Sequence, residues 1–159
     1  DTGSKLMNSH EAMRRAIKLA EEKMRSGEGR PFGCVILLDG EIIGEGWNSM
    51  DRDHDPTAHG EVVAIRDACR RLKTLNLSGA ELYTSCEPCP MCTSVIIMAG
   101  IAKLYYAASA DDTAIFGNDP SRLRREVGKP VAERSMASEQ LLGEEGRALL
   151  MGWAAMPNG

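Results

Sequence analysis

The sequence lacks any apolar run approaching the roughly 20 residues that a membrane-spanning helix needs. It also lacks an excess of basic residues, since 19 Lys and Arg stand against 23 Asp and Glu, for a formal net charge of −4. Binding to nucleic acid rests on many cationic contacts to phosphate, so this balance disfavours a nucleic-acid partner and favours a small, weakly charged one. Internal repeats and low-complexity stretches are absent as well, and 159 residues suit one compact domain.

A secretion signal is also missing, because the first residues do not follow the basic-then-apolar pattern of such signals. We therefore expect a cytoplasmic protein, with residues 1–6 as an added tail and Met7 as the native start. The chain has five cysteines, and three of them crowd into the segment from Cys86 to Cys92. In a reducing compartment this distribution indicates a metal site or a catalytic use rather than a disulfide framework.

Helices and strands are predicted to alternate along the chain. Apolar residues at helical spacing, or Pro at a first helical turn, predict helices over residues 13–24, 60–72, 91–99 and about 144–153. Short apolar runs bounded by turn residues predict strands over residues 34–38, 41–47, 81–85 and 102–108. The first two strands are joined by Asp39-Gly40, a hairpin turn signal. Strands alternating with helices indicate an α/β sandwich, a mixed sheet covered by helices.

Three candidate metal ligands stand at the starts of two predicted helices. His59 precedes Gly60-Glu61, and Cys89 and Cys92 form a C-x-x-C pair after a proline. The combination of H-x-E with P-C-x-x-C is the signature of zinc deaminases. One imidazole and two thiolates give tetrahedral zinc three protein ligands and leave a fourth position for water, which is typical of a catalytic site. The positive end of each helix favours a thiolate cysteine and a neutral histidine.

Glu61 is the candidate proton carrier. It lies two residues after His59, so on a continuous helix the two side chains point about 200° apart, and Glu61 is not expected to bind the metal. Two thiolates offset most of the zinc charge, so a carboxylate is needed to take a proton from water, a role typically worth about 10²–10⁴ in rate. The same group then delivers the proton to a ring nitrogen and to the leaving amine.

The C-x-x-C pair by itself leaves other interpretations open. A strand followed by C-x-x-C at a helix start is also typical of a thioredoxin-like redox site, and a non-catalytic zinc module would use the same pair. A zinc ribbon needs a second C-x-x-C well separated from the first, and an iron–sulfur run that begins as Cys86-x-x-Cys89-x-x-Cys92 needs a fourth cysteine nearby. The sequence has neither. Cys86 is predicted to be a buried thiol, with a place lining the site as the alternative.

Longer motifs resemble a known family, the cytidine-deaminase-like zinc hydrolases, and within it the small guanine deaminases. The similarity runs from about Glu11 to Arg134 and is strongest over residues 30–33 (RPFG), 55–61 (DPTAHGE) and 82–92 (LYTSCEPCPMC). The resemblance implies a three-layer α/β/α sandwich with a mixed five-stranded sheet. It also implies a single deaminase domain over residues 1–159, one Zn²⁺ per subunit and a homodimer.

The resemblance assigns a reaction and its main residues. It implies zinc-dependent hydrolysis of a free nucleobase, with guanine converted to xanthine and ammonia. His59, Cys89 and Cys92 match the zinc ligands of the family, and Glu61 matches its proton shuttle.

Four further residues are candidates for binding the base. Asn48 matches an asparagine that hydrogen-bonds the base, and Phe32 matches an aromatic residue that lines the base pocket. The chain departs from the family where an acidic residue in a Phe-Asp-Asp segment recognises the purine. Asp119 is the candidate there, and the nearby Asp111 and Asp112 are the alternatives. The family also contributes an aromatic residue from its C-terminal tail, and Trp153 is the nearest aromatic in this chain.

Two related groups offer alternative substrates. His59-Gly60-Glu61, with Met91-Cys92-Thr93 and Ile96-Ile97-Met98, resembles the small fungal cytosine deaminases, which use the same zinc chemistry on a pyrimidine. The tRNA adenosine deaminases are a third group, and they need a basic surface for the anticodon arm. The net charge of −4 ranks tRNA behind guanine and cytosine.

Overall fold

The protein is described here by a computed structural model that covers residues 6–157, so residues 1–5 of the predicted added tail lie outside the described residues. Two compact units make up the chain, Asp1–Leu123 and Arg124–Gly159. The first unit holds α1 (Ser9–Arg25), β1 (Gly33–Leu38), β2 (Glu41–Trp47), α2 (Met50–Asp53), α3 (Gly60–Leu72), β3 (Glu81–Cys86), α4 (Pro90–Met98), β4 (Lys103–Ala108) and a 3₁₀ helix (Asp111–Phe116). Helix α5 (Ser121–Gly128) spans the boundary.

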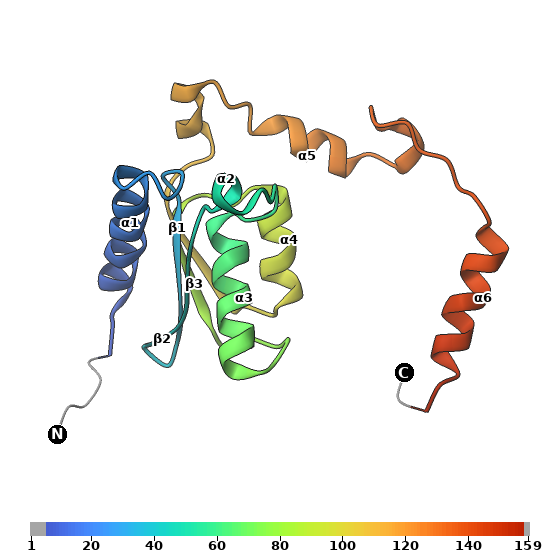
Figure 1. Ribbon diagram of the computed structural model, residues 1–159, viewed down its shortest axis with the longest axis horizontal. Coiled ribbons are helices and arrows are strands. Elements are labelled where there is room, and N and C mark those ends of the chain that lie inside the picture. Colours follow the sequence, from blue (N-terminus) through green and yellow to red (C-terminus); the bar gives the residue numbers. More distant parts are fainter. Residues whose placement is uncertain (1–5, 158–159) are drawn as a thin grey trace. The chain divides into compact units, whose positions relative to one another are not determined.

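The first unit is the predicted three-layer sandwich. Its sheet has the strand order β2-β1-β3-β4, with β1 antiparallel to both neighbours and β3 parallel to β4. Helix α1 covers one face, and α3 and α4 cover the other (Figure 1). Two apolar clusters fill the spaces between the layers, one against α1 around Tyr83 and one against α3 and α4 around Ile36 and Leu82.

The prediction of a five-stranded sheet is wrong for residues 6–157, where the sheet has four strands. After β4 the chain turns at once into the 3₁₀ helix, because the Asp112 carboxylate accepts a hydrogen bond from the Ser109 amide at 2.8 Å. The next segment, α5, is rich in arginine and has no alternating apolar pattern that would suit a strand.

Local sequence signals explain where the elements of the first unit begin and end. The Oδ1 atom of Asn8 accepts a hydrogen bond from the Glu11 amide at 2.9 Å, which caps α1. Asp39 and Gly40 both have positive φ, 52° and 82°, as the tight turn between β1 and β2 requires. The segment 49–56, for which the sequence predicts no helix or strand, contains the four-residue helix α2.

Two glycines on β2 let α3 pack closely against the sheet. A Cβ atom at Gly46 would meet the Ala64 backbone nitrogen and would lie 2.6 Å from the Gly60 carbonyl oxygen. A Cβ atom at Gly44 would lie 2.6 Å from the Ala64 carbonyl oxygen. Glycine is therefore required at both positions, because any side chain there would push α3 away from the sheet.

The second unit includes a 3₁₀ turn (Val131–Glu133) and α6 (Gly143–Ala154). Glu126 accepts hydrogen bonds from the Lys129 ammonium at 2.8 Å and from the Ser135 amide at 2.8 Å, and these contacts lower its pKa to about 2. Helix α6 agrees with the helix predicted over residues 144–153, and it has no buried residue. Within residues 6–157, no helix is both long and apolar enough to cross a membrane.

We predict that Gly46→Ala lowers the free energy of unfolding by about 1–3 kcal/mol, because the added methyl group overpacks the contact between β2 and α3. Gly146→Ala in α6 is the matched control, since a Cβ atom there has nothing within 4 Å. This control is expected to leave stability unchanged or to raise it by up to about 1 kcal/mol. Urea unfolding of both variants measures the difference, and equal stability of the two would contradict the close-packing argument.

Candidate active site

Three metal-ligand side chains meet where α3 and α4 begin. His59 caps the N-terminus of α3, Cys89 caps α4, and Cys92 lies in the first turn of α4. The Nδ1 atom of His59 lies 3.7 Å from the Sγ atom of Cys89 and 3.5 Å from the Sγ atom of Cys92. All three ligand atoms lie within 4.8 Å of one another.

The spacing of these atoms fits tetrahedral zinc. Zn–S bonds of about 2.3 Å and Zn–N bonds of about 2.0–2.1 Å, joined at tetrahedral angles, separate nitrogen from sulfur by about 3.6 Å. The separations of 3.7 and 3.5 Å match that value. The three side chains predicted as ligands therefore stand at the distances that a zinc ion requires, from two helices far apart in the sequence.

Hydrogen bonds among the three ligand side chains shift the pKa values of all three. The pKa of Cys89 is lowered to about 4, first by a hydrogen bond from the Cys92 thiol and then by one from His59. The pKa of Cys92 is raised in turn by its bond to Cys89 and by burial. The pKa of His59 is also raised, because its hydrogen bond to Cys89 outweighs the lowering caused by burial. A cation entering such a set displaces these protons.

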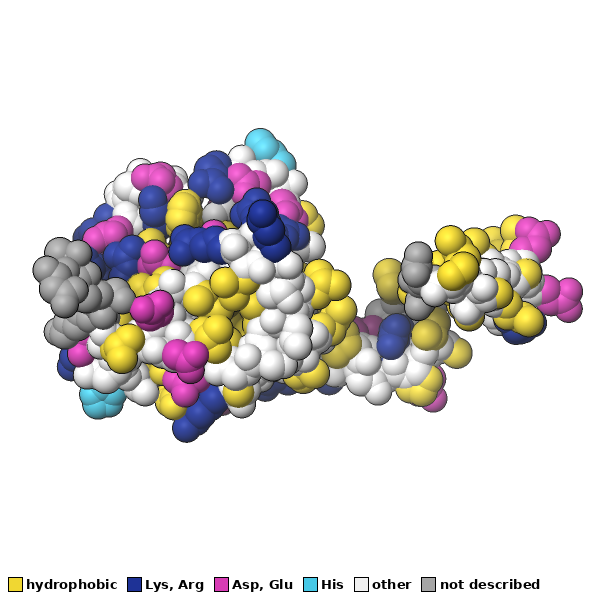
Figure 2. All heavy atoms as spheres, turned by 90° about the horizontal axis from the view of Figure 1, so that it is seen from below, with side chains coloured by type: hydrophobic (Ala, Val, Ile, Leu, Met, Phe, Trp, Pro, Cys, Tyr) yellow, Lys and Arg dark blue, Asp and Glu magenta, His cyan; other side chains and the backbone are white. Residues whose placement is uncertain are grey.

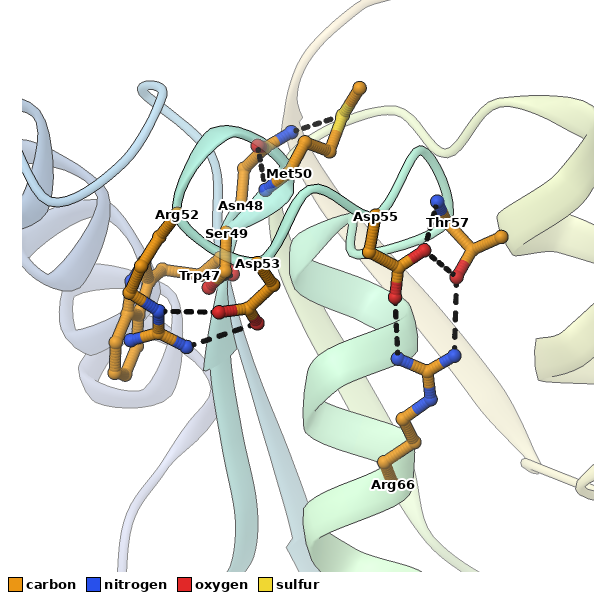
Figure 3. Close-up of polar contacts among 9 residues, drawn as sticks. All are labelled: Trp47, Asn48, Ser49, Met50, Arg52, Asp53, Asp55, Thr57 and Arg66. Atoms are coloured by element: carbon orange, nitrogen blue, oxygen red, sulfur yellow. Dashed lines mark hydrogen bonds and ion pairs between the residues drawn. The ribbon is translucent and has the colours of Figure 1, made fainter.

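A polar network holds the loop that leads into His59 (Figure 3). Asp55 Oδ1 accepts hydrogen bonds from the amide and hydroxyl of Thr57, at 2.8 and 2.7 Å. Arg66, on α3, reaches back to Asp55 Oδ2 at 3.4 Å and to the Thr57 hydroxyl at 3.1 Å. The His59 amide then donates to the Thr57 carbonyl at 2.7 Å. The loop is thus tied to the same helix that His59 caps.

Glu61 lies buried beside the ligand cluster. It is the second residue of α3 and is only 6% exposed. Burial raises the pKa of its carboxyl group, while hydrogen bonds from Cys92 and Thr84 act in the opposite direction. The Thr84 hydroxyl donates to Glu61 Oε1 at 2.7 Å, a contact that the strand pattern of β3 did not predict. The carboxylate is therefore close to the ligands without belonging to the metal-ligand group.

Asn48 and Phe32 lie next to the start of α3. The backbone amide of Asn48 donates a hydrogen bond to the Phe32 carbonyl at 3.0 Å. The backbone amide of Ser49 donates one to the Ala58 carbonyl at 2.9 Å. The Phe32 carbonyl oxygen is 3.3 Å from the position that a Cβ atom would take at Gly60. These contacts bring both predicted base-binding residues to the segment that carries His59 and Glu61.

The side chains of these two residues have defined partners. Asn48, only 4% exposed, accepts a hydrogen bond from the Met50 amide at 3.3 Å and donates to the Met50 sulfur at 3.4 Å (Figure 3). Phe32 packs edge-to-face on Phe116, with ring centroids 6.4 Å apart and an interplanar angle of 75°. Phe116 comes from the 3₁₀ helix after β4, and no sequence motif predicted its contact with Phe32.

The other two residues predicted to contact the base, Asp119 and Trp153, are both exposed to solvent. Asp119 is exposed, and its carboxylate accepts hydrogen bonds from the amide and hydroxyl of Ser121, at 3.1 and 2.6 Å, at the start of α5. Trp153 lies on α6 in the second unit and is 62% exposed.

We predict that Cys92→Ala abolishes tight zinc binding, while Cys86→Ala retains one zinc per chain. Cys86 is the matched control because it is a buried thiol, as predicted, and lies outside the ligand group. Zinc content after exhaustive dialysis, measured by elemental analysis, separates the two variants. Zinc loss from Cys86→Ala, or zinc retention in Cys92→Ala, would contradict this ligand assignment.

The curated proteins to which the chain is similar include deaminases of two kinds. The chain is 43% identical over 152 residues to the guanine deaminase of Bacillus subtilis, a match that covers 96% of this chain and 97% of the relative. It is also 43% identical over 93 residues to the tRNA-specific adenosine deaminase of Aquifex aeolicus, covering 58% of this chain and 61% of that protein.

Solved structures agree with the sequence relatives. The X-ray structure of guanine deaminase from Bacillus subtilis matches with a TM-score of 0.92 and 42% identity, covering 96% of this chain and 98% of that chain. Guanine deaminase from Nitrosomonas europaea matches with a TM-score of 0.70 and 26% identity, covering 98% and 90%.

The family whose description is "Cytidine and deoxycytidylate deaminase zinc-binding region" matches residues 7–108. That range contains all three ligand side chains and Glu61, and the likeness to the relatives extends well past it. The chain therefore belongs to this family of zinc-binding deaminases.

Proposed function

We propose that this protein is a zinc-dependent aminohydrolase that converts guanine and water to xanthine and ammonia. The observation that carries the proposal is the extent of the match to a guanine deaminase, 96% of the chain, compared with 58% for the tRNA-specific adenosine deaminase of Aquifex aeolicus. The ligand set and the buried carboxylate supply the chemistry that the reaction needs.

His59, Cys89 and Cys92 would hold the zinc, which when bound supplies the activation of a water molecule. Glu61 is placed to take up a proton from that water, because its carboxyl group is buried next to the ligands. Burial raises the pKa of the carboxyl group, and so helps it to carry two protons in turn. The first comes from the attacking water and passes to a ring nitrogen. The second comes from the hydroxyl group added to the ring carbon and passes to the leaving amine. The carboxylate is regenerated when ammonia leaves.

We propose that Asn48 and Phe32 contact the base. Asn48 is buried and held by Met50, so its amide offers fixed hydrogen-bonding groups at low entropic cost. The Phe32 ring, supported by Phe116, offers an aromatic surface for a flat heterocycle. On the family resemblance alone, we also propose that Asp119 and Trp153 contribute to substrate binding.

We predict that zinc-loaded protein releases ammonia from guanine, and that Glu61→Gln lowers kcat by about 10²–10⁴ because it removes the group that moves protons. A panel of guanine, cytosine, adenine, their nucleosides and a tRNA anticodon arm measures the specificity. Zinc content serves as the control, since Glu61 is not a proposed ligand and its variant should keep the metal.

Other outcomes of the same panel identify the alternatives. Turnover of cytosine alone would replace guanine with a pyrimidine substrate, and turnover of the anticodon arm alone would favour the activity named for the second relative. A metal-free protein whose Cys89–Cys92 dithiol oxidises reversibly, without hydrolytic activity, would indicate a redox module instead.

We also propose that residues 1–159 act as one deaminase domain, because the match to the guanine deaminase runs across both compact units. A cytoplasmic location is proposed from the reduced thiols that zinc binding requires. A homodimer is proposed as well. Its support is the exposure of large apolar side chains on α6, where Leu149 is 74% and Leu150 is 66% exposed (Figure 2).

We predict that the protein sediments at about twice its chain mass of 17.3 kDa at micromolar concentration. Leu150→Glu is expected to weaken the association because it places a charge on the exposed apolar face of α6. Arg147→Glu is the matched control, since it changes charge on the same helix without removing an apolar side chain. A wild-type monomer at this concentration would contradict the dimer.

A further inference from the structure

We propose that Thr84 is a positioning residue for the reaction, and that its hydroxyl group fixes the orientation of the Glu61 carboxylate. This inference rests on the proposed deamination. It concerns a residue of β3 that lies outside the metal-ligand group. The sequence places it only in the predicted strand over residues 81–85 and in the motif LYTSCEPCPMC.

The position of Thr84 calls for an apolar residue. It lies in β3 between Cys34 of β1 and Tyr106 of β4, and its side chain is fully buried. A buried hydroxyl group without a partner destabilises a protein, so a valine of similar shape would be the simpler choice. The hydroxyl at this position is explained by what it contacts.

Its contacts identify the group that it orients. Thr84 Oγ1 lies 2.7 Å from Glu61 Oε1 and 3.1 Å from the Cys86 carbonyl oxygen. A hydroxyl has one hydrogen to donate, and the shorter distance matches a hydrogen bond to a charged carboxylate oxygen. The hydrogen is therefore assigned to Glu61 Oε1.

The chemistry of the two side chains makes this contact effective. The terminal torsion of a glutamate side chain has a broad energy profile, so the carboxylate plane turns easily unless something holds it. Threonine is stiff at its first side-chain torsion, which makes its hydroxyl a fixed point on the sheet. One oxygen of Glu61 is thus occupied by Thr84, and Oε2 is left to exchange protons with water and substrate.

The second hydrogen bond to Glu61 does not substitute for this one. It comes from the Cys92 thiol, and Cys92 belongs to the metal-ligand group. A cysteine that binds zinc is a thiolate and has no hydrogen to donate. Of these two donors, only Thr84 is compatible with an occupied metal site.

The test compares kcat and KM of Thr84→Val and Thr84→Ser for guanine. Thr84→Val removes the hydroxyl and keeps the shape, so kcat should fall roughly 10- to 100-fold, while KM stays within about twofold of the wild-type value. Thr84→Ser keeps the hydroxyl, so its kcat should stay within roughly threefold of wild type. Zinc content should stay at one per chain in both.

A control on the same strand separates positioning from stability. Tyr83→Phe removes a buried hydroxyl from the opposite face of β3, where it bonds to Glu81 and Ser9, and should leave kcat unchanged. If Thr84→Val does not fold, Thr84→Ala and Thr84→Ser still differ by one oxygen atom. The serine variant should then be the faster of the two, again by roughly 10-fold or more.

The kcat of a double mutant distinguishes positioning of Glu61 from a purely structural role of Thr84. In a Glu61→Gln background, Thr84→Val should cause no further loss of kcat, because the carboxylate that it orients is gone. Full kcat in Thr84→Val, equal losses in the serine and valine variants, or additive losses in the double mutant would each overturn the inference. A wild-type protein that releases no ammonia from any base would overturn the proposed function, and that result is obtained without any Thr84 variant.

Discussion

The close packing of α3 on β2 is the contact on which the position of the reaction centre depends. Gly44 and Gly46 leave no room for a side chain, so the helix backbone rests directly on the strand. The first turn of α3 is thereby held at a fixed depth in the fold, and it carries His59 and Glu61. Helix α4 brings the two cysteine ligands to the same place from a different part of the chain.

This arrangement allows one short segment to serve two purposes. His59, at the N-cap of α3, points to the thiol pair, while Glu61, in the first turn, points to the fully buried Thr84. The two side chains diverge because His59 has the extended backbone of an N-cap residue, with φ −69° and ψ 156°, whereas Glu61 already belongs to the helix. The network of Asp55, Thr57 and Arg66 keeps the approach to this turn in place.

Much of this could be predicted from the sequence, because the relevant signals are local. Helical spacing, the Asp39-Gly40 turn and Pro90 predicted elements that the structure contains with small shifts at their ends. The ligand group was predictable because H-x-E and P-C-x-x-C each lie at one helix start. Contacts between distant segments were not: the Thr84 hydrogen bond and the Phe116 ring depend on how strands and loops meet. The fifth strand was expected from the family resemblance alone, and the element that follows β4 is a 3₁₀ helix.

The ligands, the carboxylate and Thr84 all precede Ala108, the last residue of β4. The proposed metal ligands and the proposed proton carrier are therefore encoded separately from the 3₁₀ helix, α5 and α6 that follow. Substitutions and insertions in the later third of the chain leave these residues unchanged. Libraries confined to residues after 108 would therefore test new heterocycles without altering the proposed catalytic residues.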